Sequence, residues 1–588
     1  MIRIIAIPFL LLIGSASSFG QTYNKIDNRV KLIIDSTYNS LIEKNKVVGT
    51  SIAIVKNGEI IYATGYGYQN QESSIKADEN TIYRIGSCTK SFTALSVMQL
   101  QEQGKLDVNN PIQEYVPQIK IKNRFTEENP ILIHSIFNHS SGLPSDIING
   151  FFCDNPPSID WLIDQLNKCT MAASSGYQHS YSNTGYSLLG KLIEETSGQD
   201  YEAYVSDNIF KPLGMTSSYI TAPSNLLTQT SKGYMDDKAI DETMIRDAAA
   251  GLIHSNVIDM AKYVNMYLAD GKSLASAASI DEMEKDGLDK LVLQTSRQWG
   301  YGLYGNDISI VTGDDSVKAR VIGHGGDTWA FHADFQYIPE LNLGAVVLTN
   351  TNNGSKIRSA KKLLDLYLKT SSKSTIKVLA KEANPDLPKD LICSPNDIIG
   401  QYHLGGITIN VENPEKIKFK QGGAKIVMKP MNDSLRYNAK VKLLSIIPIK
   451  IKHQEFKFVD YNKEIYMKVI QTRTGNEDYV SKKSERKIIP NDWKNKLGNY
   501  TLVGDFYECK DCPYMNFEEL GLSLAIKNEI LVMKLDGKSK DVERELKFDP
   551  ISSEIATSYG IGRNSGETLR VLKNGNLFYS GFEFQKLP

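Results

Sequence analysis

The first 370 residues contain stretches of alternating apolar and polar side chains, separated by a long middle region without this alternation. Residues 51–56 and 59–66 are rich in β-branched, aromatic and other apolar side chains, which is typical of strands. Asn57 and Gly58 lie between them, and this dipeptide predicts a tight hairpin. The spacing of apolar residues predicts further strands at residues 317–322, 330–338 and 344–350, a helix at 355–368, and a mainly helical, loop-rich region at 85–300.

Ser87 and Lys90 lie where the alternating pattern changes to a helical one. Side chains three residues apart share one face of a helix, so we expect the amine of Lys90 beside the hydroxyl of Ser87. Such an amine can accept the serine proton and so activate a poor nucleophile. The first N–H groups of the helix have no partner within it, and they favour negative charge on an attacked carbonyl. A Ser-x-x-Lys pattern alone is weak, because many solvated helix starts contain it.

Two further motifs follow in order, Tyr181-Ser182-Asn183 and His324-Gly325-Gly326. With these motifs the chain resembles the penicillin-recognising serine hydrolases, which are related to class C β-lactamases, D-alanyl-D-alanine carboxypeptidases, esterases and S12-type serine peptidases. The resemblance covers roughly residues 25–370 and extends to further segments at residues 84–94, 104–107, 139–144, 212–215 and 250–252.

The resemblance implies a role for each motif residue. Ser87 would be the nucleophile, Lys90 its proton acceptor, and Tyr181 a second base and the acid that protonates the leaving group. Asn183 would hold Lys90 and contact the substrate. The backbone N–H groups of Ser87 and Asp327 would form the oxyanion hole. An ordinary tyrosine has a pKa near ~10, so Tyr181 can act as a base only if the charge of Lys90 favours the phenolate.

The third motif departs from the family pattern. Many relatives have Lys-Thr-Gly there, and the lysine and threonine side chains help to bind a substrate carboxylate. Here the substrate-binding positions would be His324, Gly325 and Gly326, and Gly325 has no hydroxyl. With an ordinary pKa near ~6.5, His324 would be only partly charged at neutral pH. This weakens the case for an efficient β-lactamase.

We therefore expect a serine hydrolase that cleaves an ester, an amide or a D-amino-acid peptide bond through an acyl-enzyme on Ser87. A β-lactamase or a D-alanyl-D-alanine carboxypeptidase is one alternative. A non-catalytic protein that binds peptidoglycan peptides is another. The expected partner is a small-molecule or peptide substrate, with peptidoglycan fragments among the candidates, and the sequence leaves the oligomeric state open.

The resemblance also implies how the predicted elements assemble. Residues 21–370 would form a β-lactamase-like serine hydrolase domain of the α/β class, with an antiparallel sheet, covering helices, a helical subdomain and a site in the crevice between them. A linker rich in Ser, Lys and Pro is expected at residues 371–395. Short strands of period two follow. A repeated pattern, in which Pro-Asn-Asp precedes Gly-x-Tyr, occurs at residues 395–402 and again at 490–500. It favours two related, lipocalin-like all-β domains at residues 396–486 and 487–588, although a single larger sandwich is nearly as good an interpretation.

Composition and charge narrow the class of protein further. The 588 residues are too many for one core, and 67 basic and 68 acidic residues give a net charge of −1. This balance lacks the basic surface typical of nucleic-acid binding. Arg3, an apolar run at residues 4–13 and small residues up to Gly20 predict a signal peptide over residues 1–20. That run is too short to span a bilayer, so we expect a periplasmic or secreted protein without an integral membrane segment.

The histidines and cysteines predict no metal or cofactor. His139 is expected to hold loop carbonyls, and the spacing of the other histidines outside the third motif fits no metal site. Cys153 and Cys169 flank a predicted helix and could form a disulfide. Cys509 and Cys512 are a single Cys-x-x-Cys pair, for which a local disulfide is a better interpretation than zinc. Cys88 is expected to pack in the core and Cys393 to be unpaired.

Overall fold

The computed structural model of the protein describes residues 23–588, apart from a set of short gaps. The predicted signal peptide and the pair Cys509 and Cys512 lie outside the described residues. The gaps are residues 127–129, 242, 383, 405–406, 422–423, 432–434, 444–446, 485–487, 505, 508–519 and 537–543.

A nine-stranded antiparallel sheet forms the centre of the first 380 residues, in the order β10-β11-β12-β13-β14-β1-β2-β3 with β15 paired to β11. Asn57 and Gly58 both have positive φ, at 49° and 79°, so the predicted hairpin between β1 and β2 is confirmed. The strands are β1 (Gly49–Lys56), β2 (Glu59–Asn70), β3 (Ile75–Lys76), β10 (Gln298–Trp299), β11 (Tyr304–Thr312), β12 (Asp315–Asp327), β13 (His332–Ile338), β14 (Leu343–Thr349) and β15 (Ser374–Val378).

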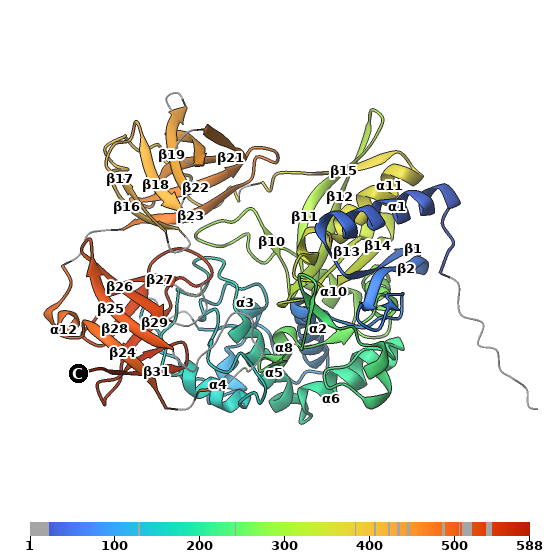
Figure 1. The fold of residues 1–588 in the computed structure, drawn as a ribbon, viewed down its shortest axis with the longest axis horizontal. Coiled ribbons are helices and arrows are strands. Elements are labelled where there is room, and N and C mark those ends of the chain that lie inside the picture. Colours follow the sequence, from blue (N-terminus) through green and yellow to red (C-terminus); the bar gives the residue numbers. More distant parts are fainter. Residues whose placement is uncertain are drawn as a thin grey trace, which may run out of the picture.

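Helices cover both faces of this sheet, as its residues require. In β1, Ile52 and Ile54 belong to one apolar cluster with α1 (Asn28–Asn45) and α11 (Ala360–Ser371). Ala53 and Val55 point to the opposite face and join the main core with α2 (Thr89–Glu102) and α9 (Val257–Leu268). Because successive side chains of a strand point to opposite faces, a strand buried on both sides reads as an almost continuous apolar run. In Figure 1, α1 and α11 lie above the sheet and α2 lies below it.

The remaining helices form a second half beside the sheet, as predicted for residues 85–300. These are α3 (Ile133–Phe137), α4 (Ile159–Leu166), α5 (Asn183–Ser197), α6 (Tyr201–Val205), α7 (Lys211–Leu213), α8 (Ala248–Gly251) and α10 (Ala277–Glu284). The predicted mixed fold with a helical half is therefore confirmed. Helix α11 begins later than predicted because the side chain of Ser359 caps it, accepting from the N–H of Lys362. Part of the expected linker, β15, pairs with β11 and belongs to the sheet.

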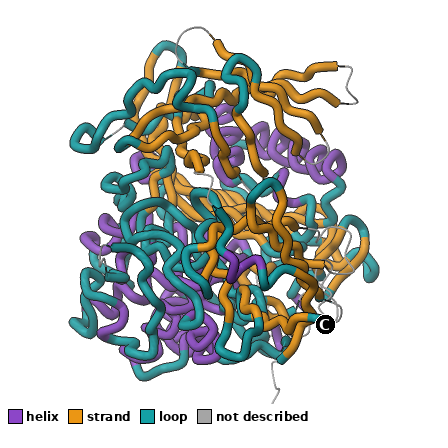
Figure 2. Tube along the Cα trace, turned by 90° about the vertical axis from the view of Figure 1, so that its left-hand side faces the viewer, coloured by secondary structure: helices purple, strands orange, loops and turns teal. Residues whose placement is uncertain are grey.

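The strands after residue 396 form two separate antiparallel sheets. The first has eight strands: β16 (Gly400–Leu404), β17 (Ile407–Val411), β18 (Ile417–Gln421), β19 (Ala424–Met431), β20 (Arg436–Leu443), β21 (Ile447–Tyr461), β22 (Glu464–Gln471) and β23 (Glu477–Ser484). The second follows α12 (Asn491–Lys494) and closes into a barrel: β24 (Gly498–Val503), β25 (Gly521–Lys527), β26 (Ile530–Asp536), β27 (Arg544–Pro550), β28 (Ile555–Ser558), β29 (Thr568–Val571), β30 (Leu577–Tyr579) and β31 (Phe582–Lys586). In the turned view of Figure 2 the first of these sheets is at the top and the C-terminus, which follows β31, is in the lower half.

The repeated sequence pattern gives the same local structure in both sheets. Tyr402 and Tyr500 are buried, and each donates a hydrogen bond from its hydroxyl to the carbonyl oxygen four residues earlier, at 3.0 and 2.5 Å. Gly400 and Gly498, two residues before each tyrosine, have φ of 152° and 135°. The shared geometry supports a structural relationship between the two sheets.

The predicted disulfide between Cys153 and Cys169 was wrong. Cys153 and Cys169 are both free, and each donates its thiol to a nearby carbonyl oxygen, of Gly150 and Gln165 respectively. Cys88 and Cys393 are buried and free, as predicted. Among the described residues, no helix is long and apolar enough to cross a membrane, and no three His, Cys, Asp or Glu side chains gather as a metal site would need.

Candidate active site

Ser87 lies in a short turn, Gly86–Cys88, directly before α2. Strand β12 passes so close to this turn that a Cβ on Gly326 would lie 1.9 Å from the carbonyl oxygen of Ile85 and 2.9 Å from the nitrogen of Ser87. A Cβ on Gly86, whose φ is 53°, would lie 2.9 Å from the nitrogen of Asp327. The two glycines therefore let the backbone nitrogens of Ser87 and Asp327 approach the same spot, as an oxyanion hole requires.

Lys90 is fully buried below Ser87, in the first turn of α2. Its Nζ lies 3.2 Å from Ser87 Oγ and donates to Asn183 Oδ1 and to the carbonyl oxygen of Ala250, both at 2.7 Å. Burial and, next, the positive charge of Arg563 lower the pKa of Lys90 to about 7, while Asp146 acts in the opposite direction. The predicted pairing of Ser87 with Lys90 is present in the structure.

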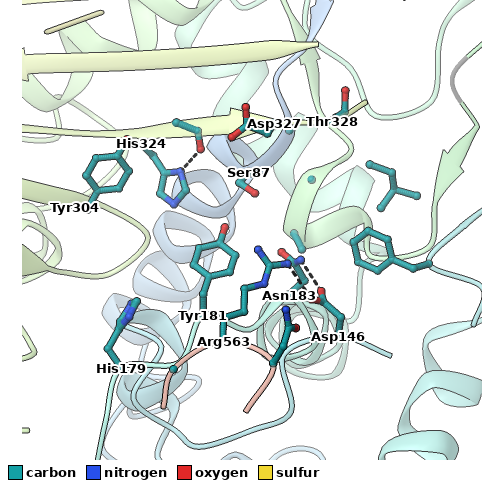
Figure 3. Close-up of a pocket in the computed structure, with 18 of the residues that line it drawn as sticks. Ser87, Asp146, His179, Tyr181, Asn183, Tyr304, His324, Asp327, Thr328 and Arg563 are labelled. Carbon is teal, nitrogen blue, oxygen red and sulfur yellow. Dashed lines mark hydrogen bonds and ion pairs between the residues drawn. The ribbon is translucent and has the colours of Figure 1, made fainter. Parts of the chain in front are cut away.

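Tyr181 points its hydroxyl towards Ser87 (Figure 3). Lys90 Nζ lies 5.0 Å from the centre of its ring. Burial raises the pKa of Tyr181 above that of an ordinary tyrosine, although an interaction with Ser87 and the charge of Arg563 act to lower it. The expected effect of Lys90, to favour the phenolate, is thus not seen, because desolvation outweighs the nearby positive charge. Tyr181 is a neutral phenol in this site.

His139 has the predicted structural role and orients the second motif, but its ring accepts a backbone N–H instead of holding a loop carbonyl. Its Nδ1 accepts a hydrogen bond from the backbone N–H of Ser182 at 3.1 Å, and its carbonyl oxygen accepts from the N–H of Ser180 at 2.8 Å. Its ring lies 4.1 Å from the ring of Tyr181, centre to centre. The buried histidine therefore fixes the loop from which Tyr181 and Asn183 reach the site.

Asn183 connects Lys90 to a pair of charged residues that the sequence did not indicate. While its Oδ1 accepts from Lys90, its Nδ2 donates to Asp146 Oδ1 at 2.7 Å. The other oxygen of Asp146 accepts from Arg563 Nη2 at 2.8 Å, as Figure 3 shows. Arg563 also lies over the ring of Tyr181, with its Cζ 5.1 Å from the ring centre.

His324 is buried and neutral, which corrects the expectation that it is partly charged at neutral pH. Burial lowers its pKa to about 3, and Lys90 lowers it as well. Its Nδ1 lies 2.6 Å from the carbonyl oxygen of Gly325, so the proton is on Nδ1, and Nε2 is a buried acceptor without a hydrogen-bond partner among the described residues. The rings of Trp299 and Tyr304 lie 5.6 and 5.2 Å from its ring, centre to centre.

Gly325 makes room for two side chains from elsewhere in the chain. A Cβ there would lie 3.1 Å from the hydroxyl oxygen of Tyr304 and 3.6 Å from Cζ of Arg358. Arg358 also donates to the carbonyl oxygen of Gly326 at 2.7 Å and forms an ion pair with Asp327. The cation beside the third motif is therefore Arg358 instead of a residue of the motif itself.

A cavity of about 1090 Å³ opens above Ser87. The predicted residues Tyr181, Asn183, His324 and Asp327 line it together with Ser87, whereas Lys90 and Gly326 lie behind its wall. The opposite wall comes from the C-terminal barrel, which contributes Leu535, Leu546, Gly562, Arg563, Asn564, Glu567, Tyr579 and Ser580. The barrel is thus a wall of this cavity.

Comparisons with known proteins agree with this geometry. The profile of the Beta-lactamase family matches residues 34–368, more than half of the chain. Protein flp of Staphylococcus aureus (strain MRSA252) is 26% identical over 341 residues, which make up 56% of this chain and 64% of that protein. The chain thus spans less than two thirds of the flp relative's length.

Two further matches cover almost the whole length of the other protein. A Beta-lactamase of Pseudomonas fluorescens is 26% identical over 365 residues, 57% of this chain and 98% of that one. The solved octameric penicillin-binding protein homologue from Pyrococcus abyssi has 26% identity and a TM-score of 0.50, and the match covers 76% of this chain and 99% of that one. The family resemblance drawn from the motifs is confirmed, and the chain belongs to the Beta-lactamase family.

Proposed function

We propose that the protein is a serine hydrolase that forms an acyl-enzyme on Ser87 and releases it with water. The observation that carries the proposal is the buried amine of Lys90, whose Nζ lies 3.2 Å from Ser87 Oγ and whose pKa is about 7. A general base is most effective when its pKa lies near the working pH, and Lys90 meets this condition. A lysine with only a structural role does not need a lowered pKa.

The contacts of Lys90 orient its lone pair. In the neutral form the amine has two N–H groups, and these donate to Asn183 Oδ1 and to the carbonyl oxygen of Ala250. The lone pair then faces Ser87 Oγ, whose proton it takes as the oxygen attacks the carbonyl carbon of the substrate. The negative charge that develops on the carbonyl oxygen is stabilised by the backbone N–H groups of Ser87 and Asp327.

Tyr181 supplies the proton for the leaving group. As a neutral phenol it donates its proton to the departing oxygen or nitrogen. The proton that Lys90 took from Ser87 then passes to the tyrosine, which becomes a neutral phenol again. A water molecule attacks the acyl-enzyme in the second half of the cycle. Lys90 takes a proton from this water as it attacks, the bond between the acyl carbon and Ser87 Oγ breaks to release the acid, and the proton passes to Oγ, which restores the hydroxyl of Ser87.

At His324, the third motif favours substrate groups that donate a hydrogen bond over carboxylates, which only accept. A neutral His324 with an unpartnered acceptor nitrogen suits a hydrogen-bond donor of the substrate, such as an amide N–H or an ammonium group. Esters, amides and D-amino-acid peptides are accordingly the substrate classes that we propose. The similarity to the Beta-lactamase of Pseudomonas fluorescens favours a second candidate function, that of a β-lactamase, because the match spans 98% of that protein.

One panel of substrates distinguishes these candidates. The protein is incubated with p-nitrophenyl esters, D-amino-acid p-nitroanilides and nitrocefin, with Ser87→Ala as the inactive variant and Ser73→Ala, on an exposed loop, as its control. We expect turnover of an ester or D-amino-acid amide that Ser87→Ala abolishes and Ser73→Ala keeps. Faster turnover of nitrocefin would favour the β-lactamase, and no turnover of any substrate would favour a binding protein.

We also propose that the protein acts in the periplasm or outside the cell. The support is the pattern of residues 1–20, a basic residue, a short apolar run and small residues before Gln21. Mass spectrometry of the protein from cell fractions tests this. An N-terminus at Gln21 in the exported fraction is expected, and an intact Met1 confined to the cytoplasm would contradict it.

A further inference from the structure

The C-terminal barrel sends one loop into the catalytic half of the molecule. This loop connects β28 to β29 and carries Arg563, Asn564 and Glu567, all of which line the cavity above Ser87. Arg563 comes from a part of the chain 417 residues away from its partner Asp146. In Figure 3 its side chain lies between Tyr181 and Asp146.

A continuous series of contacts runs from this arginine to the nucleophile. Arg563 donates to one oxygen of Asp146 at 2.8 Å, and the other oxygen accepts from the amide of Asn183 at 2.7 Å. The amide oxygen of Asn183 accepts from Lys90 at 2.7 Å, and Lys90 Nζ lies 3.2 Å from Ser87 Oγ. Because the carboxylate of Asp146 can only accept, it fixes the NH₂ group of Asn183 on its own side and the amide oxygen on the side of Lys90.

The same loop also holds the backbone that carries Asp146. Glu567 accepts from the N–H of Ser145 at 2.8 Å, and the N–H of Asn564 donates to Ser145 Oγ at 2.9 Å. The carbonyl oxygen of Ser145 in turn accepts from the N–H of Asn183 at 2.9 Å. Two routes, one through side chains and one through the backbone, therefore link the barrel to Asn183.

We propose that the C-terminal barrel is a structural part of the active site, and that Arg563 is a positioning residue that orients Asn183, and through it Lys90, by way of Asp146. This inference rests on the proposed function, because it names the residue that sets up the proton acceptor of that same site. An ordinary docking ion pair would hold the barrel in place but would leave the proton acceptor unchanged.

Removal of Arg563 affects Lys90 in two ways. The amide of Asn183 loses its fixed orientation, which lowers the rate, and a positive charge near the amine is lost. The charge of Asp146 is then no longer balanced, so both electrostatic changes favour the protonated amine. The pKa of Lys90 should therefore rise when Arg563 is removed, in keeping with the present effect of Arg563, which lowers it.

The test compares Arg563→Gln with Arg570→Gln in the full-length protein. Arg570 is a matched control, since it also belongs to the barrel and donates to the hydrolase half, at the carbonyl oxygen of Lys168, but it does not line the cavity. The readout is kcat/KM for a p-nitrophenyl ester between pH 5 and 9. Melting temperatures of both variants show that they are folded.

We expect Arg563→Gln to lower kcat/KM at least tenfold and to move the acidic limb of the profile to higher pH. Arg563→Lys should have a rate and an acidic limb between those of Arg563→Gln and the wild type. Arg570→Gln should be near wild type in both. An Arg563→Gln variant whose rate and acidic limb both match Arg570→Gln would overturn the inference while the proposed function stands. A wild-type protein without turnover that depends on Ser87 would overturn the proposed function and this inference with it.

Discussion

The amine of Lys90 is the proton acceptor in the chemistry that we propose for this site. It is fully buried, it donates to two fixed acceptors, and its pKa of about 7 makes a large fraction of it neutral at physiological pH. Tyr181 has a raised pKa in the same cavity and remains protonated. These opposite pKa shifts fit the roles of base and acid that we propose for Lys90 and Tyr181.

The pH dependence of the reaction follows from the charge of Lys90. Only the neutral amine accepts a proton, and the amine is protonated below about pH 7. We expect kcat/KM to rise about tenfold per pH unit up to that value and then to level off.

Lys90→Ala should lower kcat/KM by about 10²–10⁴-fold, since it removes the general base. An unchanged rate in Lys90→Ala, measured by ester hydrolysis, would show that another group is the base.

His324 should not titrate in the physiological range. Burial holds its pKa at about 3, so the imidazole stays neutral between pH 5 and 9. The measurement is the pH dependence of the histidine ring signals by ¹H–¹⁵N NMR, with His324→Asn to assign the signal. A constant shift of the His324 signal over this range is expected, and a midpoint between pH 6 and 7 would restore the charged histidine that the sequence suggested.

Strand β12 and the turn of Ser87 approach each other as closely as the proposed oxyanion hole requires because both carry a glycine at the point of contact. Gly326→Ala would place its Cβ 1.9 Å from the carbonyl oxygen of Ile85 and push the strand away from Ser87. Gly521→Ala is the control, because its Cβ would meet nothing closer than 3.6 Å, an ordinary contact. We expect Gly326→Ala to lose about 10²-fold or more in kcat with a folded core, comparable to loss of an oxyanion donor, and Gly521→Ala to lose almost none. Equal activity of both variants would contradict this geometry.

The elements of the hydrolase half could be predicted from sequence because their signals are local. Asn57 and Gly58 specify their own turn, and Ser87 and Lys90 are three residues apart at a helix start. The beginning of α11 was misplaced, since residues Gly354–Lys356 form a separate 3₁₀ turn and the cap of α11 is Ser359. Strand β15 was missed because it is an edge strand that pairs with β11 at long range, and its sequence resembles a polar linker.

At the scale of the whole molecule, the barrel docks on the hydrolase half through closely packed backbone. A Cβ on Gly566 would lie 2.0 Å from the carbonyl oxygen of Ala172, and the φ of Gly566 is 74°. Gly575 has a similar φ of 87°, and a Cβ there would meet nothing within 4 Å. Alanine at either position therefore carries a similar cost in backbone conformation, about 1–3 kcal/mol. Only Gly566→Ala also disturbs the contact between the barrel and the hydrolase half.

Gly566→Ala should reduce ester turnover far more than Gly575→Ala, because displacement of the barrel removes Arg563 from Asp146. Hydrogen exchange of residues 145–149 provides the structural readout, and it should be faster in Gly566→Ala only. If both variants keep full turnover although exchange shows a displaced barrel, the barrel is not needed for the chemistry.

The contribution of the barrel could not be predicted from the sequence. Arg563 lies in a glycine-rich loop that carries no catalytic motif, and only the folded chain brings it to Asp146. The charge of His324 was predicted wrongly for a similar reason, since it depends on burial by Trp299 and Tyr304 from other strands. Motifs locate the groups that react, whereas their charge and orientation depend on distant parts of the fold.

The rate at which a fluorophosphonate labels Ser87, followed by intact mass and peptide mapping at several pH values, tests the central claim most directly. A single adduct on Ser87 is predicted, with a labelling rate that rises with pH to a plateau above about pH 7 and is largely lost in Lys90→Ala. An adduct on another residue, or labelling of Ser87 that does not change with pH or with the loss of Lys90, would contradict it.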